Sequence, residues 1–490
     1  MIVNVLSVIL LTIRIRTEVF HFMNLVRRCF GIKDYPESSQ PTLIEMYKEN
    51  LSIAWPATVE GALMAIIGSV DTMMVGTLGS EAIAAVGITG QPRMILLILA
   101  QALCVGTTAL VARRKGADDR AGANSTLMQS MFVVTLLGFL MAAVGYIFAE
   151  PFMRFAGANE ETLGLATDYF KIIALGFPCS YWNLCLCAAM RAIGKTRITM
   201  VTNITANLVN VCFNYCLIGG HLGFPALGVR GAALATTIGT CVACVIAFWF
   251  SMRPDGYLQF RFRIPKFDRI TMGGLFKVGS SSMAESVFLR LGFLINARLI
   301  AGIGTSAMAT YQIVQQTTGL SFTLGDGIAA AGATMVGQSL GAKRKDLAMA
   351  NVRISRKLSV VTSLVLMALI LVFRRSLAAL FTTDEAIIYG ATLAFLVVVV
   401  GILPQNGRVV YSGCLRGAGD VKYVAVCSLI SVAILRPIFT YVLCYPVNEA
   451  LPRLQMAMTG PWIAFVLDAF VREILLYHRI RQGKWLNIRL

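Results

Sequence analysis

The sequence predicts an all-α polytopic membrane protein with twelve transmembrane helices in two six-helix bundles, related by a parallel internal repeat. Composition, recurring apolar runs and the repeat lead to this fold class. Hydrophobic residues make up 57% of the 490 residues, charged residues only 14%, and the mean hydropathy is +0.72. A soluble domain carries about 25% charged residues. The apolar runs leave no stretch for a separate soluble domain.

The first 50 residues are expected to form a cytoplasmic N-terminal segment. Residues 1–12 are an apolar run too short to span a bilayer, and the basic residues that flank it, Arg14 and Arg16, lie on the wrong side for a signal peptide. Met23 is a plausible alternative start. Both a mature chain that includes residues 1–22 and one that lacks them therefore stay open.

Twelve apolar runs follow, and about 20 such residues suffice to cross a bilayer. The predicted spans are 51–78, 90–112, 126–148, 165–188, 198–218, 231–250, 273–300, 310–340, 355–373, 386–411, 422–445 and 460–478. They divide the chain into an N-terminal lobe at 51–252, a cytoplasmic linker at 253–272, a C-terminal lobe at 273–478 and a cytoplasmic tail at 479–490.

The net charge of +18 comes from 43 basic and 25 acidic residues, and the basic residues collect in alternate loops. Examples are Arg113, Arg114, Lys115 and Arg120 after the second span, Arg191, Lys195 and Arg197 after the fourth, and Lys343, Arg344 and Lys345 after the eighth. Arg374 and Arg375 are exceptions. Because positive loops stay cytoplasmic, both termini are expected in the cytoplasm of a cell-membrane protein, which is the inner membrane if the source is bacterial. This clustering argues against nucleic-acid binding.

The chain repeats itself at a constant shift of 225 residues. The shift aligns Glu60 with Glu285 and Asp71 with Asn296. It also aligns Gly79 with Gly304, Gly116 with Gly341, Arg191 with Arg416 and Gly194 with Gly419. Six spans per copy give both halves the same orientation, so the repeat is parallel, and a cavity between two such bundles suits alternating access.

The 12 cysteines and three histidines show no catalytic or metal-binding pattern. Most cysteines lie in apolar runs, and the pair Cys241 and Cys244 is interpreted as packing residues. We therefore expect neither an enzyme nor a resident cofactor or metal.

Glu60 and Asp71 lie inside the first apolar run. A charge at membrane depth costs at least about 2.5 kcal/mol, so such residues are seldom accidental. Their spacing places them within about 20° on one helical face, about 16 Å apart along the axis. That face is expected to look into a protein cavity, since lipid would leave both acids unsolvated.

Several motifs resemble one known family. They are LSIAWPATVEGALMAIIGSVDTMMVGTLGSEAIAAVGI in the first span and loop, the paired RAIGKTR and RGAGDVK, and GVRGAALATTIG at the sixth span. Together they resemble the multidrug and toxic compound extrusion (MATE) transporters over about residues 45 to 480. The resemblance implies a V-shaped pair of lobes that exports organic, often cationic, compounds in exchange for H⁺ or Na⁺.

The resemblance also implies cation-coupling residues. Asp71 in VDTMMVG, Asn210 and Asn214 in NLVNVCFN and Thr236 in GAALAT match the family's site in the N-terminal lobe. Glu285 in SSSMAESVF matches an acid that some members use in the C-terminal lobe. In place of the tenth-helix Asp of those members, this chain offers the amides Gln405 and Asn406, with Arg408.

A carboxylate in a low-dielectric cavity can take up a proton on one side of the membrane and release it on the other. Amide and hydroxyl oxygens can instead complete a sodium site at Asp71. Asn214, where some members carry Asp, favours protons. The alternative to ion coupling is a helix-packing hydrogen bond for Asp71. For Asn210 and Asn214 the alternative is hydrogen bonding between helices.

The candidate substrate-cavity residues are Glu60, Gln312, Gln315, Gln316, Asp326 and Arg290. The glutamines could line the cavity or bond to neighbouring helices. Glu60 and Glu285 could simply reach water or pair with a basic residue, and Arg290 could pair elsewhere or reach the membrane surface. Asp326 could replace the missing tenth-helix acid.

The sequence therefore predicts a monomeric secondary active efflux antiporter. Its expected partners are small organic substrates, H⁺ or Na⁺, and the lipid bilayer. The alternative is an exporter, or flippase, of lipid-linked saccharides or other anionic amphiphiles, which Arg290, Arg298 and Arg436 favour.

Overall fold

The computed structural model describes residues 41–254, 256–261, 265–382, 384–450 and 456–488. The question of residues 1–22 lies outside these ranges. All regular elements in the described ranges are helices, so the predicted fold class is confirmed. Residues 1–49 and 50–490 form two compact units, and both predicted lobes belong to the second.

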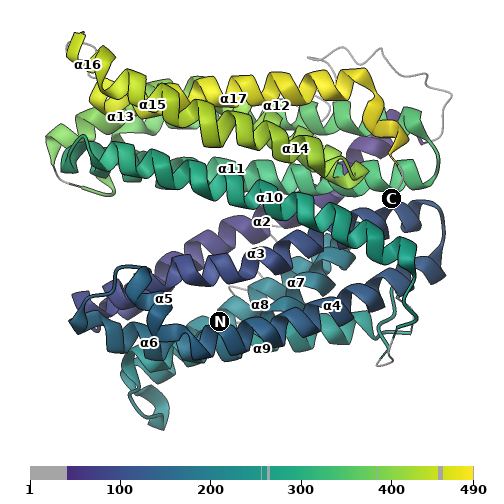
Figure 1. Ribbon diagram of the computed structural model, residues 1–490, viewed down its shortest axis with the longest axis horizontal. Helices are drawn as coiled ribbons and strands as arrows, with labels where there is room; N and C mark the ends of the chain where they lie inside the picture. The colour runs from purple at the N-terminus through teal and green to yellow at the C-terminus, as the bar shows by residue number, and fades with distance from the viewer. Residues whose placement is uncertain (1–40, 255, 262–264, 383, 451–455, 489–490) are drawn as a thin grey trace. The chain divides into compact units, whose positions relative to one another are not determined.

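The first lobe contains the helices of residues 43–251 (Figure 1). They are α2 (Leu43–Gly76), α3 (Ser80–Gly116), α4 (Arg120–Ile147), α5 (Ala149–Phe155), α6 (Glu160–Leu175), α7 (Phe177–Ala192), α8 (Thr196–Gly219), the 3₁₀ turn η1 (His221–Gly223) and α9 (Gly228–Ser251). The predicted fourth span is broken: α6 and α7 meet at Gly176 with a bend of 50°.

The second lobe contains the helices of residues 269–487. They are α10 (Arg269–Ala301), α11 (Thr305–Gly341), α12 (Lys345–Ala379), α13 (Glu385–Ala418), α14 (Val421–Ser428), the π-helical η2 (Leu429–Leu435), α15 (Arg436–Cys444), α16 (Pro446–Ala450), α17 (Met456–Gln482) and the 3₁₀ turn η4 (Lys484–Asn487). The π-helical segment ends two residues before Pro437, whose missing N–H removes a donor from the regular helical ladder.

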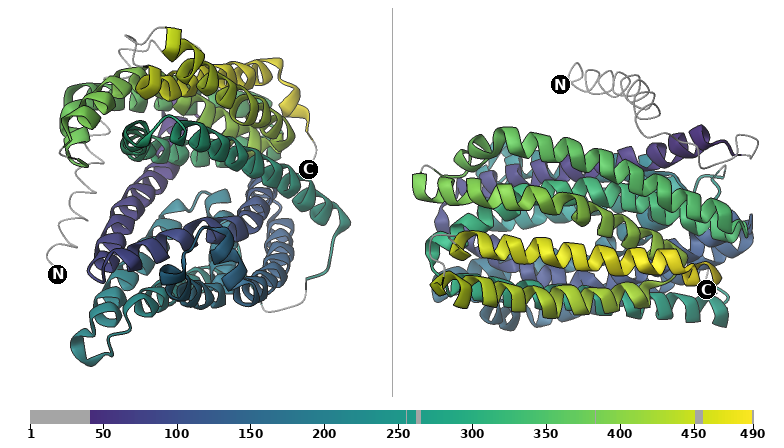
Figure 2. Two further views of the ribbon diagram at one scale, coloured as in Figure 1. Left: turned by 60° about the vertical axis from the view of Figure 1, so that its left-hand side comes forward. Right: turned by 90° about the horizontal axis from the view of Figure 1, so that it is seen from above.

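Each predicted span coincides with a straight or bent helix, and Figure 2 shows the long helices of residues 50–490 running side by side. Within the described residues, eight helices are long and apolar enough to cross a membrane, or nine if the bent pair α6–α7 counts as one span. Three other predicted spans are occupied by α10, α11 and α17. These three helices are long enough to cross a membrane but less apolar than the eight. They carry many of the polar and charged residues discussed below.

Small residues let the helices of the first lobe approach closely. A Cβ on Gly138 of α4 would lie 3.1 Å from the Cα of Pro178, and one on Gly145 would lie 3.1 Å from the Cβ of Ala174. Lipid supplies no hydrophobic drive between helices, so close packing of this kind stabilises the bundle.

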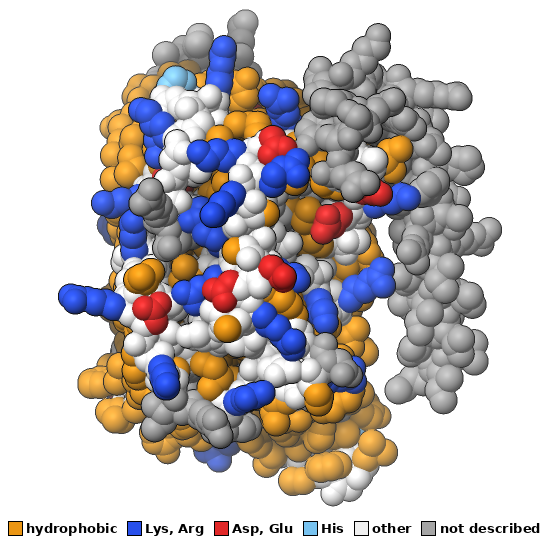
Figure 3. Space-filling model, turned by 90° about the vertical axis from the view of Figure 1, so that its right-hand side faces the viewer, with side chains coloured by type: hydrophobic (Ala, Val, Ile, Leu, Met, Phe, Trp, Pro, Cys, Tyr) orange, Lys and Arg blue, Asp and Glu red, His pale blue; other side chains and the backbone are white. Residues whose placement is uncertain are grey.

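The two lobes meet at the end where the basic loops lie. A Cβ on Gly116 of α3 would fall 1.8 Å from the backbone oxygen of Gln338, and one on Gly341 of α11 would fall 1.9 Å from that of Arg113. Gly116 and Gly341 are equivalent in the repeat, so each lobe contributes the same glycine to the crossing. The Thr334 hydroxyl also donates to the Arg191 carbonyl (3.0 Å). Figure 3 shows the basic side chains gathered on this face.

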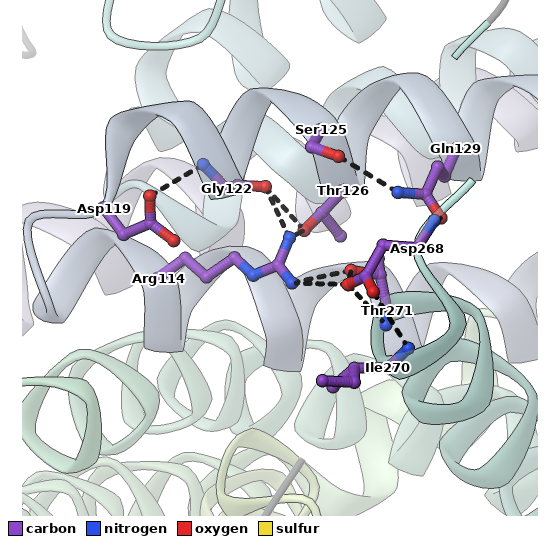
Figure 4. Close-up of polar contacts among 9 residues, drawn as sticks. All are labelled: Arg114, Asp119, Gly122, Ser125, Thr126, Gln129, Asp268, Ile270 and Thr271. Atoms are coloured by element: carbon purple, nitrogen blue, oxygen red, sulfur yellow. Dashed lines mark hydrogen bonds and ion pairs between the residues drawn. The ribbon is translucent and has the colours of Figure 1, made fainter. Parts of the chain in front are cut away.

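Arg114 fastens three helices together at the same end (Figure 4). One of its terminal nitrogens donates to the Gly122 carbonyl and the Thr126 hydroxyl of α4, both at 2.6 Å. The other donates to the Thr271 hydroxyl of α10 (2.6 Å) and lies 3.8 Å from the Asp268 carboxylate. Asp268 caps α10 by accepting from the N–H groups of Ile270 (3.2 Å) and Thr271 (3.1 Å).

This cap predicts acid sensitivity. The Thr271 hydroxyl, the N–H groups of Ile270 and Thr271, and Arg114 hold the pKa of Asp268 below its ordinary value. The cap therefore stabilises the fold fully above about pH 4, the ordinary Asp value, and its contribution is lost as the pH falls through the depressed pKa. Asp268→Asn keeps a capping side chain but removes the charge. We expect wild type to melt higher than this variant at pH 7, by a margin that shrinks as the pH falls below 4.

The measurement is thermal unfolding of both proteins in detergent from pH 3 to 7. A gap in Tm that stays constant over the whole range would contradict the role of the Asp268 charge.

Candidate functional site

A pocket of about 160 Å³ lies inside the first lobe. Its walls come from five helices: α2, α3, α6, α8 and α9. The polar residues that line it are Asp71, Thr72, Tyr169, Asn214 and Thr236. The pocket therefore contains a single carboxylate among neutral oxygen and nitrogen groups.

Two amides bond to Asp71. The Asn214 nitrogen donates to its Oδ1 atom at 2.8 Å. With its amide nitrogen turned toward Asp71, Asn210 donates to both carboxylate oxygens at 2.8 and 2.9 Å, and its oxygen accepts from the Thr236 backbone N–H (3.1 Å) and hydroxyl (3.3 Å). The structure thus brings together Asp71, Asn210, Asn214 and Thr236, four of the five residues predicted for cation coupling.

One acceptor in this cluster is left without a donor. The Asn214 Oδ1 atom is buried and has no hydrogen-bond partner within the described part of the chain. Buried polar atoms nearly always have a partner, so this oxygen is suited to an O–H group, a water molecule or a cation. Together with the Asp71 carboxylate, it gives the pocket the means to hold a proton or a small monovalent ion.

Sequence reasoning missed two residues of this site. Tyr169 of α6 is 7% exposed and lines the pocket beside Thr236. Arg93 of α3 is half-buried and close enough to interact electrostatically with both Asp71 and Tyr169. Arg93 is a charge inside a predicted span, which is the signal that singled out Asp71, so it could have been found in the same way.

Glu60 is buried away from this pocket. Its carboxylate accepts from the Thr199 hydroxyl (3.2 Å) and from the Asn203 amide (2.6 Å), both on α8. The Asn183 amide of α7 in turn donates to Asn203 (3.2 Å). Neutral donors thus satisfy Glu60, and it neither lines the pocket nor forms an ion pair within the described part of the chain.

Glu285, the repeat equivalent of Glu60, has charged partners. Arg416 binds both its carboxylate oxygens, at 2.6 and 3.2 Å, and Arg472 lies 3.4 Å from one of them. Ser428, the repeat equivalent of Asn203, lies at 3.5 Å. Because two arginines compensate its charge, Glu285 differs from Asp71, and its predicted part in cation coupling remains a prediction.

More charges surround Glu285 in the second lobe. Asp468 of α17 pairs with Arg436 of α15 (3.0 Å) and also accepts from Ser431. Arg408 of α13 is 7% exposed, and its sole hydrogen bond among described residues goes to the neutral Gln405 (2.6 Å). The Nε and Nη1 atoms of Arg472 are buried and have no partner there either. Positive charge is therefore in excess in this part of the lobe.

Asp326 of α11 also lies near these charges. Its side chain is accessible to solvent although protein surrounds it densely, and it forms no ion pair among described residues. Its charged neighbours are Arg416 and Arg408. Asp326 is therefore an accessible acid with two arginines nearby.

The other predicted cavity residues lie elsewhere on the second lobe. Gln312 and Gln316 are exposed and Gln315 is half-buried, and none of the three side chains bonds to a neighbouring helix in the described ranges. Arg290 of α10 is exposed, and its Nη2 atom lies 3.5 Å from the Met94 sulfur of α3. None of these residues lines the Asp71 pocket.

Among the described residues of the second lobe, no acid takes the place that Asp71 has in the first. The equivalent of Asp71 is Asn296, which is 1% exposed and accepts from the Thr440 hydroxyl at 2.6 Å. The scaffold is thus repeated, but an amide stands where the first lobe has an acid.

Comparisons with known proteins agree with this architecture. The MatE family model matches residues 56–216 and again residues 282–442, one match in each copy of the repeat. The chain is 30% identical to "Multidrug resistance protein PmpM" of Pseudomonas aeruginosa over 389 residues, 78% of this chain and 80% of that protein. It is 26% identical to "Probable multidrug resistance protein NorM" of Thermotoga maritima over 444 residues, 90% and 93% of the two chains.

A solved structure has a similar fold. It is described as the outward-facing conformation of a multidrug resistance MATE family transporter, with a TM-score of 0.82 and 22% sequence identity, and the match covers 90% of this chain and 97% of the other.

The contrast between Glu60 and Glu285 gives a prediction. Glu285→Gln leaves the buried Arg472 and the half-buried Arg416 without the carboxylate that pairs with them, and is expected to destabilise the protein by about 3–5 kcal/mol, the usual cost of breaking a buried pair. Glu60→Gln only replaces one hydrogen-bonding side chain by another and is expected to cost about 1 kcal/mol. Denaturant unfolding of both variants in detergent measures the difference. Equal losses would show that Arg416 and Arg472 do not depend on Glu285.

Proposed function

Because the chain belongs to the MATE family of multi-pass membrane transporters and is not an enzyme, we propose that it is a secondary active efflux antiporter. It exports organic compounds in exchange for protons by alternating access. The observation that carries this proposal is the Asp71 pocket. There the Asp71 carboxylate bonds to two amides, and the oxygen of one of them, Asn214, has no hydrogen-bond donor among the described residues.

The amides support a proton as the coupling ion. In the ionised state both donate to Asp71, which stabilises its negative charge. When Asp71 takes a proton, a half-turn of the Asn214 amide presents its oxygen as an acceptor for the new O–H group. Protonation thus requires one amide to turn, and it gives the Asn214 oxygen the donor that it lacks in the ionised arrangement.

Sodium is the alternative occupant of the same pocket. Hard cations take oxygen ligands, so a sodium ion would require both Asn210 and Asn214 to turn their oxygens inward. The Thr236 hydroxyl and the Asp71 carboxylate would complete the site. The larger rearrangement is the reason that we favour protons.

Coupling follows from competition between the proton and the substrate. An ion moves a conformational equilibrium only by its difference in affinity for the two states. A proton that binds Asp71 more tightly in one conformational state favours that state. By reciprocity, substrate binding that favours the other state lowers the affinity of Asp71 for the proton. Asp71 lies on α2 and its partners lie on α8 and α9, so movement of α2 against these helices would change the affinity.

Organic substrates are proposed because the relatives are named multidrug resistance proteins. From the positive-inside rule we propose that the basic face of Figure 3 and the C-terminal tail lie in the cytoplasm of a cell-membrane protein. The predicted cytoplasmic position of the N-terminus follows from the same rule.

A second candidate substrate class comes from the second lobe. Arg408 forms no ion pair within 4 Å among described residues, although Asp468 and Asp326 lie close enough to interact with it electrostatically, and Arg290 is exposed. A buried cation that forms no close ion pair is costly. This favours a substrate with a negative charge, such as an anionic amphiphile, whose acidic group would neutralise Arg408.

Transport in liposomes tests the coupling proposal. Export of a fluorescent cationic dye is expected under an imposed proton gradient and not under a sodium gradient, and Asp71→Asn is expected to abolish it. Asp384→Asn is the matched control, because Asp384 is a helix cap at an exposed position and Asn also caps helices. Dye export by Asp71→Asn at the wild-type rate would contradict the proposal, and export driven by sodium alone would assign the pocket to that ion.

The same assay examines Asp326, which we propose as a second coupling acid in the lobe that lacks one at Asn296. Asp326→Asn is then expected to stop transport while expression and folding stay normal. Normal transport in that variant would confine coupling to Asp71.

Replacing the unpaired cation tests the second substrate class. Arg408→Gln is expected to slow export of an anionic dye at least tenfold and to leave cationic dye export within twofold of wild type. Equal effects on both dyes would rule out a role for Arg408 in charge selection.

A further inference from the structure

A second and larger pocket, of about 640 Å³, opens on the surface between α4 and the segment that links the two lobes. The residues of α4 that line it include Arg120, Asn124 and Ser125, and those of the linker include Gln259, Arg261 and Lys266. All three charged residues are basic. No acidic residue lines the pocket in the part of the chain that the structure describes, and the proposed transport cycle does not use it.

Two of these basic residues bond to backbone or amide oxygens rather than to carboxylates of the described residues. Arg120 donates only to backbone carbonyls, those of Tyr257 (3.1 Å) and Gly256 (2.7 Å). Arg261 reaches the Gln259 amide oxygen at 3.4 Å. No ion pair joins Arg120, Arg261 or Lys266 to a carboxylate of the described residues. Asp118 and Asp119 lie near Tyr257 but outside the lining of the pocket.

Hydrogen bonds to buried and half-buried side chains fix the walls of the pocket. The Asn124 side-chain oxygen accepts from the Gln259 backbone N–H (2.6 Å), which fixes the linker against α4. Figure 4 shows the next layer: Gln129 donates to Ser125 (3.0 Å) and accepts from the Asp268 backbone N–H (3.2 Å). These hydrogen bonds therefore fix the segments that carry the basic residues of the pocket. Arg114 differs from those residues because its side chain already bonds to Gly122, Thr126 and Thr271.

Toward the C-terminus of α4, beyond the pocket, the same face of the helix is apolar. Met128 lines the pocket, and Phe132, Leu136 and Phe139 follow at spacings of three and four residues, so all share one face. These three are exposed, at 36%, 58% and 56%. The Phe132 ring packs edge-on against Phe267 at 5.1 Å, which extends the apolar surface from α4 to the end of the linker.

The depth of the pocket matches the headgroup region of a bilayer. The 28 residues of α4 extend about 42 Å, more than the about 30 Å of hydrocarbon, so its first turns stand in the polar interface. Basic pockets at this level attract anionic lipid headgroups. The apolar face from Met128 onward lies where acyl chains run.

We propose that this pocket binds the headgroup of an anionic phospholipid, with Arg120, Arg261 and Lys266 around the phosphate and an acyl chain along Phe132, Leu136 and Phe139. A free phosphate would use only the basic upper part and leave the apolar face unoccupied. A bound lipid would join α4 to the linker, and therefore the first lobe to the segment that leads into the second.

Lipid binding to the purified full-length protein tests this proposal. Native mass spectrometry with dioleoyl phosphatidylglycerol is expected to show specific binding, at least tenfold tighter than with dioleoyl phosphatidylcholine. The double variant Arg261→Gln/Lys266→Gln is expected to lose that preference. The control Arg374→Gln/Arg375→Gln removes the same charge from a half-buried and an exposed position outside the pocket and is expected to keep the preference.

Two further probes separate a lipid from a soluble anion. Glycerophosphoglycerol and inorganic phosphate are expected not to compete with the lipid, and Leu136→Asn is expected to weaken lipid binding with the basic residues intact. Unchanged preference in the Arg261/Lys266 double variant would overturn the site, and competition by the free headgroup at equal concentration would overturn the lipid assignment. Size-exclusion chromatography confirms that each variant is folded.

Discussion

A carboxylate in a low-dielectric interior must be hydrogen-bonded, paired with a cation or protonated, and the functional interpretation of this molecule depends on which of these applies to each acid. Glu60 is satisfied by a hydroxyl and an amide, Glu285 by two arginines, and Asp468 by Arg436. Asp71 alone combines a pocket with a neighbouring oxygen that still needs a donor. The acid with an incomplete arrangement is the one that can change its state.

The internal repeat supplies a scaffold with two different chemistries. The glycines Gly116 and Gly341 make the same backbone crossing from opposite lobes, which shows how closely the packing is shared. The polar sites diverge: Asn296 replaces Asp71, and Glu285 binds arginines where Glu60 binds neutral donors. One lobe is therefore suited to ion coupling, and the surplus arginine charge of the other bears on the charge of the substrate.

Sequence reasoning predicted the fold class and the family because both depend on patterns that are visible in the linear sequence. These patterns are the apolar runs, the loop charges, the family motifs and the constant shift between the two copies. It also selected Asp71, Asn210, Asn214 and Thr236, which the structure brings together, through motif resemblance. Partners distant in sequence were harder. A basic partner for Glu285 was one expected possibility, but the sequence did not identify Arg416 and Arg472, which pair with it from α13 and α17. The break at Gly176 has no strong signal in composition, and Tyr169 looks like any other aromatic residue of a span.

The central claim is that substrate and proton compete through Asp71, and proton release on substrate binding tests it most directly. Purified protein in a weakly buffered detergent solution would be mixed with a transported dye while a pH indicator is followed. Competition predicts that wild type releases protons in proportion to the dye bound and that Asp71→Asn binds dye without releasing any. Equal proton release from both proteins would contradict the claim and place the titrating group elsewhere.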